Sequence, residues 1–235
     1  MTRRIEIYLA ILTMGQIRAE LSAWKDRLLT QTHQPDSPYS VAIDHSKARP
    51  IPANRNGIWQ RFKKLRTEEK GENGQVTERP WGDWLIMCDE DTVPRSDILA
   101  WTQSDKDIIS WPCPVMRDLK KARIDLNFRL GDTGKLMLKD GKRIVKAERI
   151  GTGLFMVRRK VTETRGLHSP FADRFTNEGQ RRDGSDGVFS ERALKAGYDL
   201  WVPLDEPASH YKTVDLMAIL MHLYQRAGEA IAEQA

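Results

Sequence analysis

Three consecutive carboxylates directly follow an apolar run in the segment WLIMCDEDTVP, residues 84–94. Like charges this close repel one another unless a cation or a ligand relieves them. Residues i and i+2 of an extended chain point the same way, so we expect Asp89 and Asp91 to converge while Glu90 faces elsewhere. Two convergent carboxylates suit a hard divalent cation such as Mg²⁺ or Mn²⁺, particularly one that shares its other positions with phosphates. An exposed acidic turn is the alternative that the local sequence leaves open.

Alternating strands and helices must position these acids. The hydrophobic periodicity predicts strands at 5–13, 39–44, 84–88, 107–111, 150–157 and 198–202. It predicts helices at 15–30, 57–65, 96–101, 186–196 and 214–231, and a loop at 49–56. Ser96 is expected to cap a short helix, Gly197 to end another, and Asp140-Gly141 to turn a hairpin.

This order of elements predicts a single-domain α/β fold, in which helices flank a mostly parallel sheet. A small β-hairpin insertion and a C-terminal helix complete it, with the main domain at 1–212 and the helix within 213–235. Ligands of such sheets bind outside the carboxyl ends of the strands. Asp89, Glu90 and Asp91 stand at such an end, which is a functional position.

The composition is that of a folded protein without a membrane segment. The 235 residues are 40% hydrophobic, and no run approaches eighteen apolar residues. The N-terminal stretch MTRRIEIYLAILTMG is interrupted by Glu6 and leads to no small-residue cleavage site, so a first strand is expected rather than a signal peptide. Two cysteines exclude a disulfide framework, and Cys88 is expected to be buried. We expect a cytoplasmic protein.

Positive charge is concentrated in one segment. The whole chain has a net charge of +5, whereas residues 115–149 hold eleven Lys or Arg against five acids, 11 − 5 = +6. A local basic stretch is typical of a protein with a polyanionic partner. A solvated, lysine-rich hairpin is equally compatible with the charge pattern.

Five elements, in order, resemble the GT-A fold glycosyltransferases, particularly the inverting family 2 type. They extend from about Ile5 to Lys212. The segment ending in Asp89-Glu90-Asp91 resembles the strand that leads into the family's DxD motif. The other elements are Asn54-Arg55-Asn56, the glycine-bearing IGTGLFM at 150–156, GSDGVF at 184–189 with the helix after it, and His210 in ASHYK. One departure is Ser185-Asp186, because relatives often carry two acids there.

The resemblance implies a role for each matching residue. Asp186 would be the catalytic base that takes a proton from the acceptor hydroxyl. The implied metal ligands are Asp89, Asp91 and His210, holding Mn²⁺ or Mg²⁺. The implied contacts to the donor, a nucleotide-sugar of the UDP type, are Thr13, Arg55, Asn56, Asp89, Gly151 and Gly153.

Each of these residues also has a simpler interpretation. Asp186 fits an N-terminal helix cap, and Arg55 can anchor a loop rather than clamp a diphosphate. His210 can be a surface histidine, and the two glycines can serve tight backbone packing.

The acceptor is less well defined by the sequence. Small relatives without a membrane anchor include enzymes that decorate polysaccharides, and bacteriophage enzymes that place sugars on hydroxymethylated bases of DNA. The basic segment favours DNA, and a polysaccharide or a small molecule is the alternative. A rival of another class is a non-catalytic nucleic-acid-binding protein whose acids are vestigial. A sugar nucleotidyltransferase is disfavoured, because Leu12–Gly15 supplies one glycine where a glycine-rich phosphate loop is expected.

Overall fold

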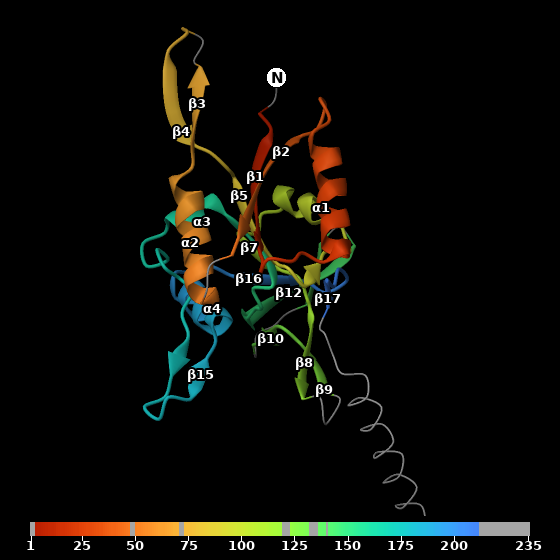
Figure 1. Ribbon diagram of the computed structural model, residues 1–235, viewed down its shortest axis with the longest axis vertical. Helices are drawn as coiled ribbons and strands as arrows, with labels where there is room; N and C mark the ends of the chain where they lie inside the picture. Colours follow the sequence, from red (N-terminus) through yellow and green to blue (C-terminus); the bar gives the residue numbers. More distant parts are fainter. Residues whose placement is uncertain are drawn as a thin grey trace, which may run out of the picture.

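The computed structural model describes residues 3–47, 50–70, 73–118, 123–131, 136–139 and 141–211 (Figure 1). In this part of the chain a nine-stranded sheet has the order β10-β12-β16-β7-β13-β5-β1-β2, and β11 pairs with β12. Counted from the β2 edge, the first strands are β2 (Tyr39–Ser46), β1 (Ile5–Leu12), β5 (Trp84–Asp89), β13 (Leu154–Arg158) and β7 (Ile108–Ser110). The others are β16 (Leu200–Pro203), β12 (Lys142–Arg149), β10 (Arg129–Leu130) and β11 (Leu136–Lys139).

Three adjacent strands at the β2 end of the sheet are parallel. β1 pairs in parallel with β2 on one side and with β5 on the other. Because β1 and β5 are buried on both faces, they read as nearly continuous apolar runs, whereas the edge strand β2 is mostly half-buried. β12 and β13 run antiparallel to the strands that they pair with. Leu12 is in register with Ser46 and with Asp89, so the carboxyl ends of the three parallel strands meet at one edge.

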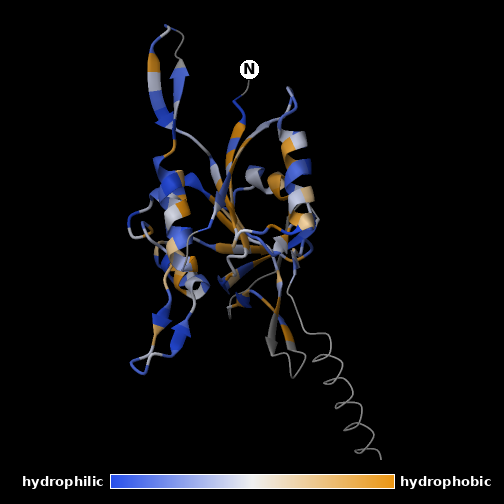
Figure 2. Cartoon of the chain, viewed as in Figure 1, coloured by the Kyte–Doolittle hydropathy of each residue, from blue (hydrophilic) through white to orange (hydrophobic). Residues whose placement is uncertain are grey.

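Helices cover both faces of the sheet (Figure 1). One face packs against α1 (Ala19–Thr32) and the 3-10 helix Ile98–Gln103, through Leu21, Trp24 and Ile98. The other face packs against α2 (Ile51–Lys64), α3 (Arg159–Glu163) and α4 (Ser185–Lys195). Figure 2 shows that these helices carry both apolar and hydrophilic residues, and the apolar residues Leu21, Ile58 and Phe189 are buried. The protein is therefore a three-layer α/β structure, and the predicted fold class is confirmed.

Short hairpins extend this frame. They are β3–β4 (Arg66–Lys70 and Val76–Pro80), β8–β9 (Pro114–Asp118 and Arg123–Leu126) and β14–β15 (Arg174–Phe175 and Arg181–Asp183). A separate two-stranded ladder pairs β6 (Thr92–Val93) with β17 (Ser209–His210), which are distant in the sequence. Of the predicted turn at Asp140-Gly141, Asp140 lies outside the described residues; Lys139 pairs with Lys142, and Gly141 has a φ of 77°. Such a backbone conformation favours glycine.

The segment 49–56, predicted as a loop, is largely helical. α2 begins at Ile51, with Pro50 as its N-cap and Pro52 in the first turn. Prolines are tolerated there because the first N–H groups of a helix have no partner within the helix. Asn54 and Arg55 are therefore presented by a helix, and both are buried.

Other boundaries also differ from the prediction. β13 begins only at Leu154, so Gly151 and Gly153 precede the strand instead of lying within it. The 3-10 helix is capped by Asp97, whose carboxylate accepts the Leu99 N–H at 3.0 Å, and not by Ser96. Gly197 ends α4 with a φ of 86°, as predicted. The predicted helix at 214–231 lies outside the described residues.

Both cysteines are buried free thiols, which confirms the interpretation of Cys88. In the described part of the chain, no helix has the length and apolar character needed to span a bilayer.

Candidate active site

A buried arginine joins two carboxylates where the parallel strands end. Arg55, presented by α2, is only 4% exposed. Its Nη2 donates to both carboxylate oxygens of Asp89 at 3.0 Å. Its Nη1 donates to Oδ1 of Asp186 and to Oγ of Ser185, both at 3.1 Å. One cation thus neutralises acids from the end of β5 and from the first turn of α4.

Asp89 and Asp186 share this one cation, and the pKa values of Asp89 and Arg55 reflect the arrangement. Burial raises the pKa of Asp89, the negative charges of Asp186 and Asp91 raise it further, and the opposing effect of Arg55 does not cancel them. Burial alone would lower the pKa of Arg55, but the neighbouring Asp89 and Asp186 carboxylates raise it above its ordinary value. The cluster therefore retains an excess of negative charge that a further cation would relieve.

The two oxygens of Asp186 have different surroundings. Oδ1 accepts from Arg55 and from the hydroxyl of the fully buried Thr152, the latter at 2.5 Å. In the described part of the chain, Oδ2 has no hydrogen-bond partner, and the side chain is 39% exposed. Gly184 is the N-cap of α4, and no side chain caps this helix. Asp186 is thus held in one orientation with one oxygen open, and it is not the helix cap that the sequence allowed.

The last acid of the DxD segment, Asp91, forms a pair with His210. The short β6–β17 ladder pairs His210 with Thr92, and this places Nε2 of His210 3.4 Å from Oδ2 of Asp91. Nδ1 of His210 lies 2.7 Å from the carbonyl oxygen of Pro114. Because a carbonyl only accepts, Nδ1 carries the proton of this bond, and Nε2 is directed at the carboxylate. Metal-binding histidines are commonly oriented in this way, with the other ring N–H held by a carbonyl oxygen.

No group of three or more His, Cys, Asp or Glu side chains that could hold a metal is found within the described residues. The pair Asp91–His210 nevertheless fits Mn²⁺ or Mg²⁺, which commonly take the rest of their ligands from phosphate and water.

The three consecutive acids do not follow strand alternation. β5 ends at Asp89, and Glu90 and Asp91 form a turn. Asp89 is directed to Arg55 and Asp91 to His210. Glu90 accepts the hydroxyl of Thr13 at 2.8 Å and the Met14 N–H at 2.6 Å. The expectation that Asp89 and Asp91 face one point while Glu90 faces elsewhere is wrong, because the turn brings Glu90 and Asp91 to one pocket instead.

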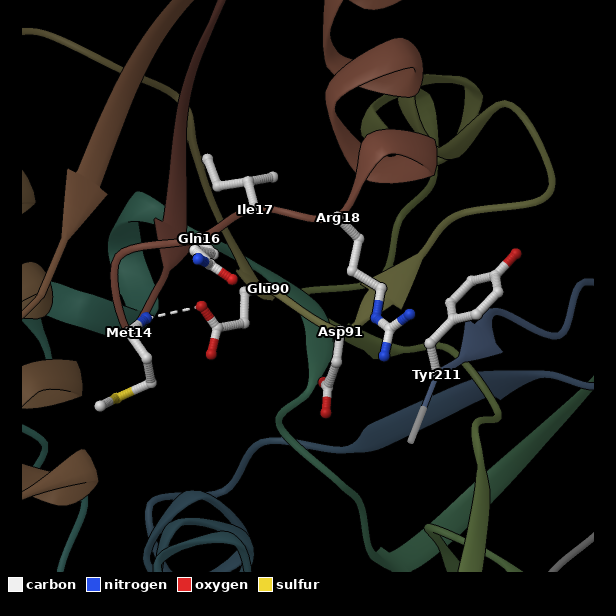
Figure 3. Close-up of a pocket in the computed structure, with 7 residues that line it drawn as sticks. All are labelled: Met14, Gln16, Ile17, Arg18, Glu90, Asp91 and Tyr211. Carbon is white, nitrogen blue, oxygen red and sulfur yellow. Dashed lines mark hydrogen bonds between the residues drawn. The ribbon is translucent and has the colours of Figure 1, made fainter. Parts of the chain in front are cut away.

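This pocket has a volume of about 650 Å³. It is lined by Met14, Gln16, Ile17, Arg18, Glu90, Asp91 and Tyr211. Figure 3 shows the side chains of Glu90, Asp91 and Arg18 pointing to the same side. The Arg18 guanidinium lies over the Tyr211 ring, 5.3 Å from its centroid. No carboxylate within the described residues pairs with Arg18, so the pocket offers a positive group to a ligand.

The remaining predicted residues divide between this site and the framework. Thr13 does not line the pocket but donates its hydroxyl to Glu90, which does. A Cβ on Gly153 would lie 3.5 Å from Oδ2 of Asp89, so this glycine lies directly against the acid cluster. Asn56 instead holds the backbone of Phe171 through two hydrogen bonds of 2.7 and 3.0 Å. Gly151 allows the close approach of Asn127, whose Nδ2 would lie 2.3 Å from an added Cβ. The last two positions serve packing.

Sequence reasoning missed four contributors to the site. They are Arg18, Glu90, Thr152 and Tyr211. The sequence could have predicted Arg18 as a site residue, because it follows the first predicted strand and ligands of parallel sheets bind at strand ends. Tyr211 could have been indicated by its position directly after the predicted ligand His210. Thr152 lies between Gly151 and Gly153, and only these glycines were interpreted.

No family model matches the sequence, and no curated protein matches it. Among solved structures, the chain is similar to A197 from STIV, with a TM-score of 0.51 at 16% identity, covering 89% of this chain and 87% of that one. GalNAc-T7 with UDP, GalNAc and Mn²⁺ gives 0.49 at 10% identity, over 90% of this chain and 44% of that one. The inositol-1-phosphate CTP transferase from T. maritima gives 0.42 at 8% identity, over 94% and 96%. At its identity, the likeness to A197 is one of fold.

Proposed function

We propose that this protein is a metal-dependent inverting glycosyltransferase, which moves a sugar from a nucleoside-diphosphate donor of the UDP type to an acceptor hydroxyl. The observation that carries the proposal is Asp186, fixed through Oδ1 by Arg55 and Thr152 and open at Oδ2. This open base belongs to the same strand-end cluster as a pocket that holds Asp91, Arg18 and the nearby His210. The ordered resemblance of these segments to GT-A glycosyltransferases supports the same activity.

In the proposed reaction, Oδ2 of Asp186 takes the proton of the acceptor hydroxyl. The acceptor oxygen forms a bond to the anomeric carbon from the face opposite the leaving group. The bond from that carbon to the diphosphate oxygen breaks, and its electron pair leaves with the nucleoside diphosphate, so the anomeric centre is inverted. The base needs a fixed oxygen and an open one, which is how Asp186 is held.

The leaving group needs positive charge where its negative charge develops. Asp91 and His210 would hold the divalent cation, which supplies charge neutralisation at the diphosphate. We assign the accompanying guanidinium contact to Arg18, because this side chain faces the pocket. Arg55 is 4% exposed and occupied by two acids, so its role is to position Asp89 and Asp186, in place of the diphosphate clamp suggested by the resemblance.

The acceptor is the less determined part of the proposal. Five basic side chains of the segment 115–149 are described, and each of them pairs with a carboxylate. The pairs are Arg129–Glu148, Lys142–Glu206, Arg143–Asp205, Lys146–Asp199 and Arg149–Asp183. Paired charge attracts a polyanion less than free charge does. DNA bearing hydroxymethylated bases is therefore an acceptor proposed from the sequence pattern, and a polysaccharide or small-molecule hydroxyl is the alternative.

Donor binding tests the proposal directly. Nucleotide-sugars should raise the melting temperature with Mn²⁺ present and much less without it, because a ligand that binds only the folded state stabilises it by mass action. Asp91→Ala should abolish the metal-dependent part, whereas Asp26→Ala, on the exposed face of α1, should not. Undiminished binding by Asp91→Ala contradicts the metal role. Stabilisation by nucleoside triphosphates but by no nucleotide-sugar would favour a nucleotidyltransferase.

Salt dependence tests DNA as the acceptor. DNA binding that relies on phosphate contacts weakens steeply as salt rises. Replacing Lys120, Lys121 and Arg123 with Ala should make that dependence shallower. Absence of DNA binding at low salt would assign the acceptor to the polysaccharide or small-molecule class.

A further inference from the structure

A second cavity lies between α1 and the loop that follows β6, and its volume is about 250 Å³. It shares no lining residue with the pocket that holds Glu90 and Asp91. Its polar lining includes Arg27 and Gln31 from α1 and Arg95 from the loop. The proposed sugar transfer uses none of these side chains, so the cavity is a candidate site for a separate ligand.

Three hydrogen-bond donors of this cavity have no partner in the described part of the chain. They are the side chains of Arg27, Gln31 and Arg95, and all three are exposed. Arg27 and Gln31 are four residues apart, so they lie on one face of the helix. Both arginines remain charged at any ordinary pH. Two cations and one amide, contributed by two segments of the chain, therefore line the same cavity.

The nearby acids do not neutralise these arginines. Asp26 is next to Arg27 in the sequence, but it pairs with Lys25 at 3.6 Å. Asp97 is the acid of the cavity lining, and its Oδ1 accepts the Leu99 N–H at 3.0 Å as the cap of the 3-10 helix. Two arginines against one aspartate leave the lining with an excess of positive charge.

Apolar side chains close the inner side of the cavity. Trp24 and Leu28 of α1 and Ile98 of the 3-10 helix line it, and they are 8%, 5% and 1% exposed. They belong to the core cluster between α1 and the sheet. Because this side excludes water, a hydrogen bond from a guanidinium to an anion is stronger here than on an open surface.

The number of donors indicates the kind of anion. A carboxylate has two oxygens, which a single guanidinium can occupy with a bidentate pair. A phosphate monoester has three terminal oxygens and carries up to two negative charges, so two guanidinium groups and an amide can share it. The cavity is smaller than the usual pocket for a drug-sized ligand, which suits a phosphate group with a small substituent.

We propose that this cavity is a second anion site, in which Arg27, Gln31 and Arg95 bind a phosphate group. The phosphate belongs either to a small soluble molecule or to a lipid headgroup. The inference is independent of the proposed function, because it uses no residue of the candidate active site.

Calorimetry with inorganic phosphate, in EDTA and at constant ionic strength, tests the inference. Phosphate should bind the wild-type protein. Arg27→Gln and Arg95→Gln should each weaken binding at least about tenfold, as expected for the loss of a hydrogen bond from a charged group. Arg165→Gln is the matched control and should bind like the wild type. Arg165 is also exposed and without a partner among the described residues, and it lines neither cavity.

Three results would overturn the inference. The first is that the wild-type protein does not bind phosphate. The second is that Arg165→Gln weakens binding as much as Arg27→Gln and Arg95→Gln do, which would show an effect of net charge alone. The third is that binding is lost in Arg18→Gln and kept in Arg27→Gln and Arg95→Gln, which would place the phosphate in the pocket at the carboxyl ends of the strands.

Two further probes identify the source of the phosphate. Glycerol 3-phosphate represents a soluble ester, and phosphatidylcholine vesicles with and without phosphatidic acid represent a lipid surface. Binding of the ester without sedimentation on the vesicles indicates a soluble ligand. Sedimentation that requires phosphatidic acid and is lost in Arg27→Gln indicates a lipid headgroup. If inorganic phosphate binds and neither probe does, the ligand is free phosphate itself.

Discussion

The two edges of the central sheet each hold a buried arginine–carboxylate cluster, and the two are built on opposite balances of charge. At the amino edge, Glu6 of β1 accepts from Arg79 at 2.6 and 2.9 Å, from the Gly82 N–H at 2.9 Å and from Arg3 at 3.2 Å. At the carboxyl edge, Arg55 alone serves Asp89 and Asp186. In the first cluster, several hydrogen-bond donors surround the single carboxylate of Glu6. In the second cluster, the single guanidinium of Arg55 is shared by two carboxylates.

The ionisation of the two acids follows this difference. Burial alone would raise the pKa of Glu6, but the hydrogen bonds from Arg79 and Gly82 outweigh it, and the pKa lies below its ordinary value. Burial raises the pKa of Asp89, and the nearby acids keep it raised against the effect of Arg55. At the amino edge the charge of Glu6 is compensated, which is consistent with a structural role in holding the β3–β4 hairpin against β1. The carboxyl edge retains negative charge, which suits a site that receives a cation and a proton.

The largest expected effect is on catalysis at the carboxyl edge. Asp186→Asn should lower the rate of sugar transfer by about two to four orders of magnitude, because an amide cannot accept the acceptor's proton. Donor affinity and melting temperature should change little, since the amide oxygen can still accept from Arg55 and Thr152. Asp183→Asn, at the end of β15, is the matched control and should keep its rate. A normal rate in Asp186→Asn would mean that another acid is the base.

The next effect is on stability at the same edge. Arg55→Met should lower the free energy of unfolding by about 3–5 kcal/mol, because it leaves buried carboxylates without their cation. Adding Asp89→Asn should restore part of this loss, and urea unfolding of both variants measures the coupling. A loss below about 1 kcal/mol for Arg55→Met would show that the cluster is far better solvated than its burial indicates.

Features of the fold and the site could be predicted where they depend on the local sequence, and not where they depend on contacts between distant residues. The α/β class and the strand-end position of the acids follow from local hydrophobic patterns, and both were predicted. The directions of Asp89, Glu90 and Asp91 were not, because alternation holds only while the chain is extended and β5 ends at Asp89. The helical context of Arg55 was missed because two prolines and two asparagines are typical of a loop.

Contacts between distant segments carry no local signal at all. Thr152 reaches Asp186 across 34 residues, and Arg55 reaches it across 131. The burial and sharing of Arg55 therefore needed the structure, whereas the hypothesis that Asp89 and Asp186 are functional could be made from the sequence.

A smaller effect on stability is expected at the amino edge. Glu6→Gln should cost about 1–3 kcal/mol of unfolding free energy, the usual range for weakening hydrogen bonds to a charged group, because Gln can still accept some of them. Sugar transfer should be unaffected, since Glu6 lies at the opposite end of β1 from the pocket. The control is Glu78→Gln, an exposed position on β4 next to Arg79. A fall in transfer rate at unchanged stability would contradict the purely structural role of this edge.

The smallest effect is the pH dependence of stability, in which the two edges should oppose each other. The pKa of Glu6 is lowered from 4.5 in the folded state, so its contribution is fully present above the unfolded pKa and is lost as pH falls through the folded pKa. The pKa of Asp89 is raised from 3.8, so the folded state holds that proton more tightly, and stability falls as pH rises from 3.8 through the folded pKa. Unfolding free energies measured in urea across the acid range should show both trends. Glu6→Gln should flatten the loss on the acid side, and Asp89→Asn should flatten the loss on rising pH. If Asp89→Asn instead steepened the decline toward higher pH, Arg55 would outweigh the neighbouring acids, and the carboxyl edge would be as satisfied as the amino edge.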